Sequence, residues 1–348
     1  MNVETTDREV LRVRGLTVTF HPKGRRKAPV QAVRGIDLVL HQGETLSVVG
    51  ESGCGKSTTA RAVLGLVKAA GEIELMGRRF DQMSPREKTR ARADIQMVFQ
   101  DPYSSLDPSQ RVGVSIAEPL EVHTDLDAKQ RRARVEELLE TVGLSAEHAD
   151  RFPHDFSGGQ RQRIAIARAL ACSPSIVVAD EAVSALDVST QNQVLKLLEE
   201  LSSSLGVAYL FISHDLAVVR HISDRVAVMY LGTLVEEAAA DALFAQPLHP
   251  YTQALLSSVL VADPARQRQR TDARLSGDLP DPSNPPSGCV FRTRCPHAME
   301  VCSREVPVPV PRSGGGTVAC HLFTEAHEGA DPGEPSPTDN LTANGSTR

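Results

Sequence analysis

Short apolar runs rich in β-branched residues alternate along the chain with segments of helical spacing. The runs occupy residues 46–50, 96–99, 175–180, 208–213 and 225–230. Their apolar residues are consecutive rather than alternating, which is typical of strands covered on both faces in a parallel sheet. Between the third and fourth runs, an apolar stripe recurs at helical spacing before Gly206: Val194, Leu197, Leu198, Leu201 and Leu205. The pattern therefore predicts an α/β fold with helices on both faces of a parallel sheet.

Other parts of the chain depart from this rhythm. Residues 10–20 and 32–40 alternate apolar and polar positions, which predicts antiparallel strands. Residues 101–160 read as helices and loops, so we expect an inserted helical subdomain within a first domain of residues 1–240. Residues 241–323 are rich in Pro and Arg and form a C-terminal extension, and residues 324–348 are polar enough to predict a disordered tail.

Composition narrows the class of protein. The chain has 348 residues and a formal net charge of −6, with its basic residues scattered, so no nucleic-acid-binding surface is expected. The N-terminus lacks the apolar core of a secretory signal, and no apolar run approaches the roughly 18 residues that span a bilayer. Any association with a membrane is therefore expected to depend on a partner protein.

A phosphate-binding loop follows the first apolar run. Gly50, Gly55, Lys56 and Ser57 satisfy the pattern G-x-x-x-x-G-K-[ST], with a strand before it and a helical pattern after it. Glycines let backbone N–H groups converge on phosphate oxygens, the lysine adds a positive charge, and the serine hydroxyl suits Mg²⁺. The residues expected around the phosphates are Gly50, Ser52, Gly53, Cys54, Gly55, Lys56, Ser57 and Thr58, with Cys54 acting only as a small filler.

An acidic pair ends the apolar run at residues 175–180. Asp180 is placed to join the Mg²⁺ shell, and Glu181 is the candidate general base that activates water. Taken alone, such a pair is also compatible with a solvated loop. The phosphate loop makes the catalytic interpretation the better one.

Residues 156–170, FSGGQRQRIAIARAL, resemble the signature sequence of ATP-binding cassette (ABC) ATPases. Ser157, Gly158, Gly159 and Gln160 occupy its defining positions, although Phe156 replaces the usual leucine. Ser157 can cap the following helix, and the two glycines allow a close backbone approach to phosphate. An ordinary capped helix is the alternative for this segment alone, and the arginines at 161, 163 and 168 need only form a solvated face.

The other elements of the ABC family occur in the expected order. Gln100 matches the Q-loop glutamine, a contact to Mg²⁺ and water, and Asp187 lies in the D-loop segment SALD. His214 matches the switch histidine near the γ-phosphate. Phe20 resembles the aromatic residue that stacks on adenine, although a core phenylalanine fits it almost as well.

The resemblance implies a fold and a mechanism. The expected fold is an ABC-type cassette of the P-loop NTPase class, with a RecA-like core sheet, an antiparallel β subdomain and a helical subdomain. Two cassettes are expected to face each other head to tail, so that each ATP lies between one phosphate loop and the partner's signature helix. Because every catalytic element is present, we expect ATP and Mg²⁺ as ligands and a site that hydrolyses ATP.

Several longer segments narrow the resemblance to bacterial oligopeptide and dipeptide permease ATPases, a family that includes nickel importers. They are VFQDPYSSLDPSQRV, DEAVSALDVSTQNQVLKLL, SHDLAVVRHISDRVAVMYLGTLVE and PLHPYTQALLSSV. The resemblance implies a second ATPase subunit, two transmembrane permease subunits, an extracytoplasmic solute-binding protein and a peripheral position on the cytoplasmic face of the bacterial inner membrane. An ABC ATPase that remodels a protein or nucleic-acid complex is the alternative function, and nickel or another small solute is the alternative cargo.

Four of the six cysteines lie in the C-terminal extension: Cys289, Cys295, Cys302 and Cys320. A reducing compartment disfavours disulfides, and the spacing C-x5-C-x6-C-x17-C lacks the tight pair typical of structural zinc. Four thiolates with loose spacing suit an iron–sulfur cluster, and the segment also resembles the module that binds 4Fe-4S in some peptide permease ATPases. Zinc and unligated thiols remain alternatives, with His297 and His321 as substitute ligands. Since residues 280–323 have few apolar side chains for a core, a metal centre would supply folding energy.

Overall fold

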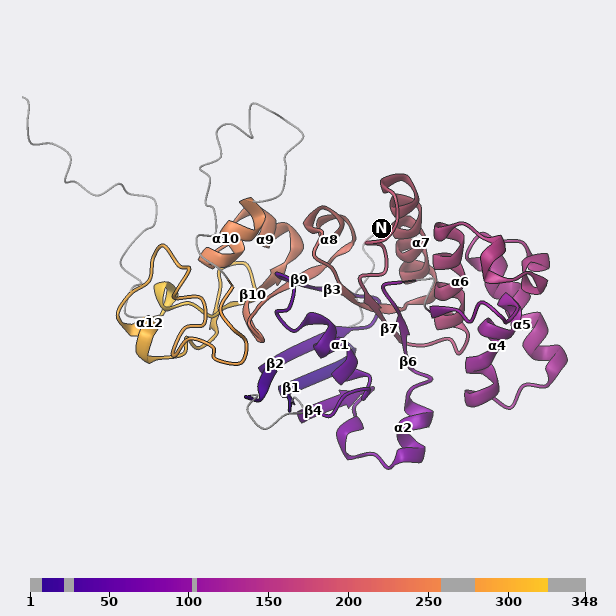
Figure 1. The fold of residues 1–348 in the computed structure, drawn as a ribbon, viewed down its shortest axis with the longest axis horizontal. Coiled ribbons are helices and arrows are strands. Elements are labelled where there is room, and N and C mark those ends of the chain that lie inside the picture. The colour runs from indigo at the N-terminus through magenta and orange to yellow at the C-terminus, as the bar shows by residue number, and fades with distance from the viewer. Residues whose placement is uncertain (1–7, 22–27, 102–104, 258–278, 325–348) are drawn as a thin grey trace, which may run out of the picture.

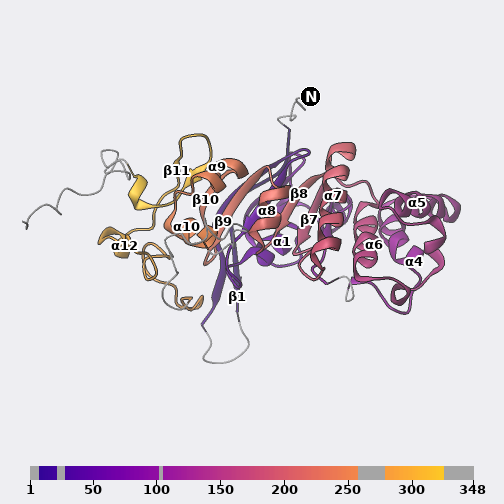
Figure 2. The ribbon, with the colours of Figure 1, turned by 90° about the horizontal axis from the view of Figure 1, so that it is seen from above.

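A computed structural model of the protein describes residues 8–21, 28–101, 105–257 and 279–324. Within these ranges the chain forms a four-stranded antiparallel sheet and an eight-stranded mixed sheet, with helices packed around them (Figures 1 and 2). One cluster of buried side chains joins residues of both sheets with residues of α1 (Lys56–Val63). This arrangement fixes the phosphate loop, which precedes α1, between the two sheets.

The mixed sheet has the strand order β11-β12-β10-β9-β3-β8-β7-β6. Its parallel strands are β3 (Thr45–Val49), β6 (Ile95–Val98), β7 (Ile176–Asp180), β8 (Ala208–Ile212) and β9 (Arg225–Tyr230). Antiparallel strands extend the sheet beyond β9: β10 (Thr233–Ala239), β12 (Thr317–Val318) and β11 (Val310–Pro311). The five apolar runs thus form the five parallel strands, as predicted.

The antiparallel sheet contains the alternating segments near the N-terminus. Its order is β2-β1-β4-β5, with β1 at Glu9–Phe20, β2 at Val30–His41, β4 at Ala70–Leu75 and β5 at Arg78–Arg79. Alternate side chains of β1 and β2 point into the core because one face of this sheet packs against α1 and the mixed sheet. The prediction of antiparallel strands is confirmed.

Helices cover the sheets and form a lobe beyond β6. The described helices are α1, α2 (Pro85–Ala91), α4 (Val112–His123), α5 (Ala128–Thr141), α6 (Gly158–Leu170), α7 (Val188–Leu205), α8 (Leu216–Ile222), α9 (Ala240–Ala245), α10 (Pro250–Ser257) and α12 (Val301–Arg304). Four short 3₁₀ segments complete the set: η1 (Phe80–Gln82), η2 (Ala146–Asp150), η3 (Pro153–Asp155) and η4 (His321–Phe323). The expected helix before residue 206 is α7, and Gly206 ends it with a φ of 67°. Its last leucine, Leu205, is 56% exposed and lies outside the buried stripe.

The lobe of α4, α5 and α6 lies to one side of the sheet (Figure 1). The interpretation of Arg161, Arg163 and Arg168 of α6 as no more than a solvated face is wrong. Arg161 donates to the carbonyl of Pro153 at 2.6 Å, Arg163 to that of Val142 at 2.7 Å and Arg168 to that of Ser105 at 2.5 Å. Each guanidinium therefore satisfies a carbonyl of a neighbouring segment, which holds these segments of the lobe against α6.

The C-terminal unit, residues 279–324, packs beside α9, α10 and β10 (Figures 1 and 2). The expectation that this region is too poor in apolar residues for a core is wrong, because it shares a core with the strands. Tyr230, Tyr251 and Phe291 are each at most 1% exposed and form an aromatic cluster, with Tyr230 lying 4.7 Å from Tyr251 and 5.2 Å from Phe291 between ring centroids. Apolar burial thus contributes to the stability of the unit without any metal.

A buried ion pair also joins the C-terminal unit to the sheet. Arg312 donates to the Glu236 carboxylate at 2.9 Å, and the two side chains are 2% and 0% exposed. Glu236 also accepts from the backbone N–H groups of Leu248 and His249, both at 2.9 Å. Burial lowers the pKa of His249 to about 3, so the ring is neutral and its Nδ1 accepts from the N–H of Tyr251. One polar network therefore links β10, which carries Glu236, with the α9–α10 connection and the C-terminal unit.

Across the described ranges, we find no helix with the length and apolarity needed to cross a bilayer. The predicted disordered tail falls almost entirely on residues 325–348, which lie outside the described residues.

Candidate active site

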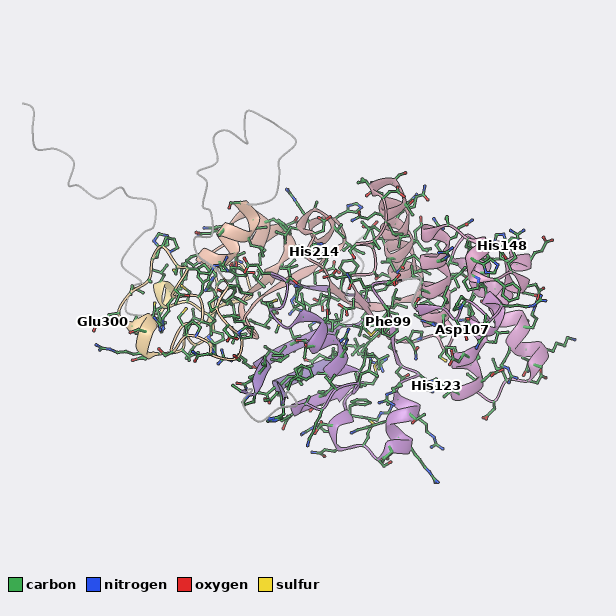
Figure 3. All side chains as sticks on the ribbon, in the orientation of Figure 1. Phe99, Asp107, His123, His148, His214 and Glu300 are labelled. Carbon is green, nitrogen blue, oxygen red and sulfur yellow. The ribbon has the colours of Figure 1, made fainter. Side chains whose placement is uncertain are left out.

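The residues expected to carry the chemistry lie at one edge of the mixed sheet. The phosphate loop, residues 50–57, follows β3, Gln100 follows β6, Asp180 and Glu181 end and follow β7, and His214 follows β8. Because parallel strands end at the same edge, residues far apart in sequence meet there. Figure 3 places Phe99, the residue before Gln100, and His214 in the central part of the molecule, away from Glu300 in the C-terminal unit.

The path of the phosphate loop depends on two glycines. Gly50 has a φ of 154°, and a Cβ atom there would lie 2.1 Å from the carbonyl oxygen of Met229. Gly55 has a φ of 111°, and its Cβ would lie 2.3 Å from the carbonyl oxygen of Ala32. Any side chain at either position would collide with the backbone of β2 or β9. The loop can therefore pass between these strands only if both positions are glycine.

Lys56 is held over the phosphate loop. Its side chain is buried, and Nζ donates to the carbonyl oxygens of Gly50 at 2.8 Å and Glu51 at 2.9 Å. Two carbonyl oxygens of the loop therefore hold the ammonium group of Lys56 in place. This group is expected to bind the terminal phosphates.

Ser57 and Asp180 form the predicted magnesium pair. The Ser57 hydroxyl donates to Oδ1 of Asp180 at 2.7 Å. Burial raises the pKa of Asp180, and the hydrogen bond from Ser57 opposes that effect. A hydroxyl and a buried carboxylate in contact form an oxygen donor set of the kind that Mg²⁺ takes beside a phosphate. The residues present therefore fit the ion.

Glu181 lies at the centre of a second polar cluster. One carboxylate oxygen accepts from the Gln100 amide at 2.8 Å, and the other lies 3.2 Å from Nδ1 of His214. Glu181 itself has a φ of 50°, a left-handed conformation that costs a non-glycine residue about 1–3 kcal/mol. Its N–H donates to the carbonyl of Ile212 at 2.9 Å, which holds this conformation in place. The orientation of the Glu181 side chain is thus fixed by its backbone conformation and by Gln100 and His214, which follow two other strands.

A cavity of about 470 Å³ opens at this edge, within the usual size of a small-molecule site. It is lined by residues of β2, the phosphate loop and the three strand ends: Ala32, Ser52, Gly53, Gly55, Lys56, Ser57, Thr58, Gln100, Glu181 and His214. The structure therefore brings the phosphate loop and the candidate base, glutamine and histidine around one space.

Some predicted residues do not line the cavity. Gly50 and Cys54 belong to the phosphate loop but do not line the cavity, and Cys54 is 1% exposed, as expected of a filler. Asp180 is buried behind Ser57. Phe20 ends β1 and is 43% exposed, so it is not a core phenylalanine, and its ring is free to stack on a ligand.

The signature residues lie on α6, away from the cavity. Ser157 caps α6 by accepting from the N–H of Gln160 at 3.3 Å, and the Gln160 side chain accepts from the N–H of Ser157 at 3.0 Å. A Cβ on Gly159 would lie 2.2 Å from Cγ2 of Thr190, so this glycine lets α6 approach α7 within the chain. Asp187 caps α7 and accepts from both the N–H and the hydroxyl of Thr190.

The predicted iron–sulfur cluster receives no support from the geometry. Within the described ranges, no group of three or more His, Cys, Asp and Glu side chains is arranged to hold a metal ion. Cys289, Cys302 and Cys320 are buried and Cys295 is half-buried, all as free thiols. Burial raises the pKa of Cys320 to about 12, and the charges of the other three cysteines add to this effect. The four thiols are therefore neighbours, but their placement is not that of a metal site.

Sequence reasoning did not identify two contributors to the site. Ala32 lines the cavity from β2. Arg294, in the cysteine-rich segment, forms a bidentate ion pair with Glu51 of the phosphate loop at 2.7 and 3.1 Å. No local pattern signals this pair, because its members are separated by 243 positions.

Two family models match the chain, one in its N-terminal part and one nearer its C-terminus. The model described as "ABC transporter" matches residues 33–184, and the model described as "Oligopeptide/dipeptide transporter, C-terminal region" matches residues 235–302. The second match covers Cys289, Cys295 and Cys302 and ends at the last of them.

The chain is also similar to curated proteins over most of its length. It is 50% identical to the oligopeptide transport ATP-binding protein OppF of Escherichia coli (strain K12), covering 88% of this chain and 95% of that protein. It is 51% identical to the oligopeptide transport ATP-binding protein AppF of Bacillus subtilis (strain 168), covering 86% of this chain and 92% of that protein.

Among solved structures, similarity extends to a dimeric cassette. The chain is 30% identical to the ATP-binding cassette MJ0796 in a dimeric post-hydrolysis state bound to ADP and Pi, with a TM-score of 0.60. That match covers 66% of this chain and 98% of the cassette.

Proposed function

The chain belongs to the ATP-binding proteins of ABC transporters, in the group of oligopeptide and dipeptide transport ATP-binding proteins, and on this premise we propose that it powers peptide import. As an ABC ATPase it hydrolyses ATP to ADP and phosphate. In the proposed role, ATP-driven closure of a cassette dimer moves the membrane subunits that carry the peptide.

The observation that carries the catalytic proposal is the convergence of Lys56, the Ser57–Asp180 pair and the Gln100–Glu181–His214 cluster around one cavity. Lys56 binds the terminal phosphates as a point charge, and Glu181 accepts the proton of the attacking water as general base. Gln100 and His214 orient Glu181 and the phosphate. Ser57, Asp180 and Gln100 would hold Mg²⁺, which neutralises charge on the phosphates.

We assign the signature residues Ser157, Gly158, Gly159 and Gln160, together with Asp187, to the ATP of a partner cassette. Their position on α6 and at the start of α7, outside the cavity of their own chain, supports this assignment, as does the dimeric state of the similar cassette MJ0796. Phe20 is proposed to stack on adenine, which its exposure at the end of β1 permits. The partner is a second copy of this chain or a homologous ATPase subunit.

For transport, we propose two transmembrane permease subunits and an extracytoplasmic solute-binding protein as further partners. The chain would then lie on the cytoplasmic face of the membrane, bound peripherally through the permeases. The names of OppF and AppF support oligopeptides as the cargo class. We divide the chain accordingly into a cassette of residues 1–240, with residues 101–160 as its helical subdomain, and an extension of residues 241–323. The match to residues 33–184 lies within the cassette, and the match to residues 235–302 lies mostly within the extension, which supports this division.

Transport is tested by deleting the gene and measuring uptake of a labelled oligopeptide. Wild-type protein should restore uptake and co-purify with two multi-span membrane proteins, whereas Lys56→Ala should co-purify with them but restore no uptake. Lys196→Ala, which changes an exposed lysine on α7, is the matched control and should behave as wild type. Recovery with ribosomes or DNA instead of membrane subunits would overturn the transport proposal.

We further propose that Cys289, Cys295, Cys302 and Cys320 hold a 4Fe-4S cluster. Four free thiols within one C-terminal unit are a chemically suitable donor set for such a cluster, which supports this proposal. The cluster would act as an additional link within the C-terminal unit, beside the apolar core.

Anaerobic purification tests the cluster directly. The protein should be brown and contain about four iron and four sulfide per chain, and Cys320→Ser should lose most of both. Cys172→Ser, outside the C-terminal unit, should keep them. Folded protein that is colourless and free of iron would remove the cluster from the proposal.

A further inference from the structure

The C-terminal unit reaches the phosphate loop through one buried arginine. Arg294 donates from Nη1 and Nη2 to the two carboxylate oxygens of Glu51, at 2.7 and 3.1 Å. The arginine side chain is 7% exposed and that of Glu51 is 26% exposed, so water screens the pair only partly. A parallel two-bond contact of this kind fixes both the position and the orientation of the carboxylate.

Arg294 is itself held by the aromatic cluster. Its guanidinium lies 5.9 Å from the centroid of the Tyr230 ring, and Nη1 lies 3.4 Å from the Tyr230 hydroxyl. Its backbone N–H donates to the carbonyl of Phe291 at 3.0 Å. Because Tyr230 ends β9 and Phe291 belongs to the C-terminal unit, the arginine is placed jointly by the sheet and by the extension.

A second contact from the extension reaches the same residue. The N–H of Glu51 donates to the hydroxyl of Tyr251, on α10, at 2.9 Å. The carbonyl of Glu51 accepts from Nζ of Lys56, also at 2.9 Å. The extension thus fixes the carboxylate and the N–H of Glu51, while the carbonyl of the same residue helps to place the phosphate-binding lysine.

Because Glu51 is negatively charged, its contact with Arg294 should affect the binding of phosphate groups at the loop. A carboxylate within a phosphate loop opposes the binding of a polyanion, and the opposition grows with the number of phosphate charges. The Arg294 guanidinium neutralises that carboxylate and holds it toward the C-terminal unit. Without the arginine, the carboxylate of Glu51 would lose its positive partner while it remains next to Ser52, a residue that lines the cavity.

We propose that Arg294 is a positioning residue for the phosphate loop, through which the C-terminal unit sets the affinity of the cassette for ATP. The inference rests on nucleotide binding at this loop and holds whether or not the chain transports peptides and whether or not its cysteines hold iron. It gives the extension a role in the ATPase cycle of its own chain.

The test measures binding of fluorescent ATP and ADP, with Mg²⁺, to full-length variants. Arg294→Met should weaken ATP binding about tenfold, with a smaller loss for ADP and a larger loss at low salt, since the added repulsion is electrostatic. Adding Glu51→Gln to that variant should restore most of the ATP affinity, because the uncompensated charge is gone. Arg292→Met, which removes a half-buried arginine of the same segment that does not contact the phosphate loop, should bind as wild type.

Rescue by Glu51→Gln separates positioning from a merely structural role. If Arg294 only stabilised the C-terminal unit, the second substitution would leave the affinity low and the salt dependence unchanged, and the proposal would fail. Arg294→Lys covers the case in which the methionine variant does not fold: it keeps the charge but loses the two-bond contact, so ATP binding should weaken by less than the tenfold expected for methionine, and adding Glu51→Gln should restore it. Wild-type ATP affinity in folded Arg294→Met would equally overturn the inference.

Discussion

Replacing Glu181 with glutamine is expected to lower ATP turnover by about 10² to 10⁴-fold, the contribution typical of a general base. The substitution keeps the size of the side chain and leaves Gln100 and His214 in place around it. ATP binding should therefore persist while hydrolysis stops, so the variant should accumulate as an ATP-bound dimer. Phosphate release in the steady state and size-exclusion chromatography with ATP measure the two effects.

Glu199→Gln is the matched control for this experiment. Glu199 lies on the exposed part of α7, near His221, and touches none of the residues around the cavity. Its variant should hydrolyse ATP at the wild-type rate. Near wild-type turnover by Glu181→Gln would show that another group activates the water, and the assignment of the general base would be withdrawn.

Replacing Arg312 with methionine is expected to lower the free energy of unfolding by about 3–5 kcal/mol. The change leaves the Glu236 carboxylate, which is 0% exposed, without its positive partner. It also removes the hydrogen bond from Arg312 to the carbonyl of Gln246 at 2.9 Å, near the end of α9. Urea denaturation followed by circular dichroism measures the loss.

Arg304→Met provides the comparison for an exposed pair. Arg304 and Glu300 lie on the surface of the same C-terminal unit, with side chains 70% and 78% exposed, so breaking this pair should cost less than about 1 kcal/mol. Combining Arg312→Met with Glu236→Gln should recover part of the stability, because no buried charge is then left unpaired. Equal losses for the two single arginine variants would contradict the buried role of Arg312.

The catalytic residues could be predicted from the sequence because each follows a recognisable local pattern. Lys56 and Ser57 begin the helix that follows a strand and a glycine-containing loop, and Asp180, Glu181 and His214 end or follow buried strands. Strands of one parallel sheet bring such residues to the same edge. The local pattern and the fold class together were therefore sufficient to predict which residues surround the cavity. Phe20 was open to two interpretations because sequence cannot tell an exposed aromatic at a strand end from a core one.

The sequence failed where a residue's role depends on a distant surface. The arginines of α6 have the spacing of a solvated face, yet they pack against carbonyls supplied by other segments of the lobe. Gly159 has a further role that the sequence did not signal, because the absence of a side chain there leaves room for Thr190 of α7. Residues 280–323 have few apolar side chains of their own, but Phe291 packs against Tyr230 and Tyr251, which lie outside that segment.

By itself, the sequence determined the α/β cassette, the phosphate loop and the family, since these depend on periodicity and on motifs of a few consecutive residues. Only the tertiary structure decided that the C-terminal unit contacts the phosphate loop. Glu51 and Arg294 are 243 positions apart, and no local sequence pattern around either residue predicts their contact. Their contact exists because β9, α10 and the C-terminal unit bury one aromatic cluster together, and side-chain packing of that kind leaves no periodic trace in the chain.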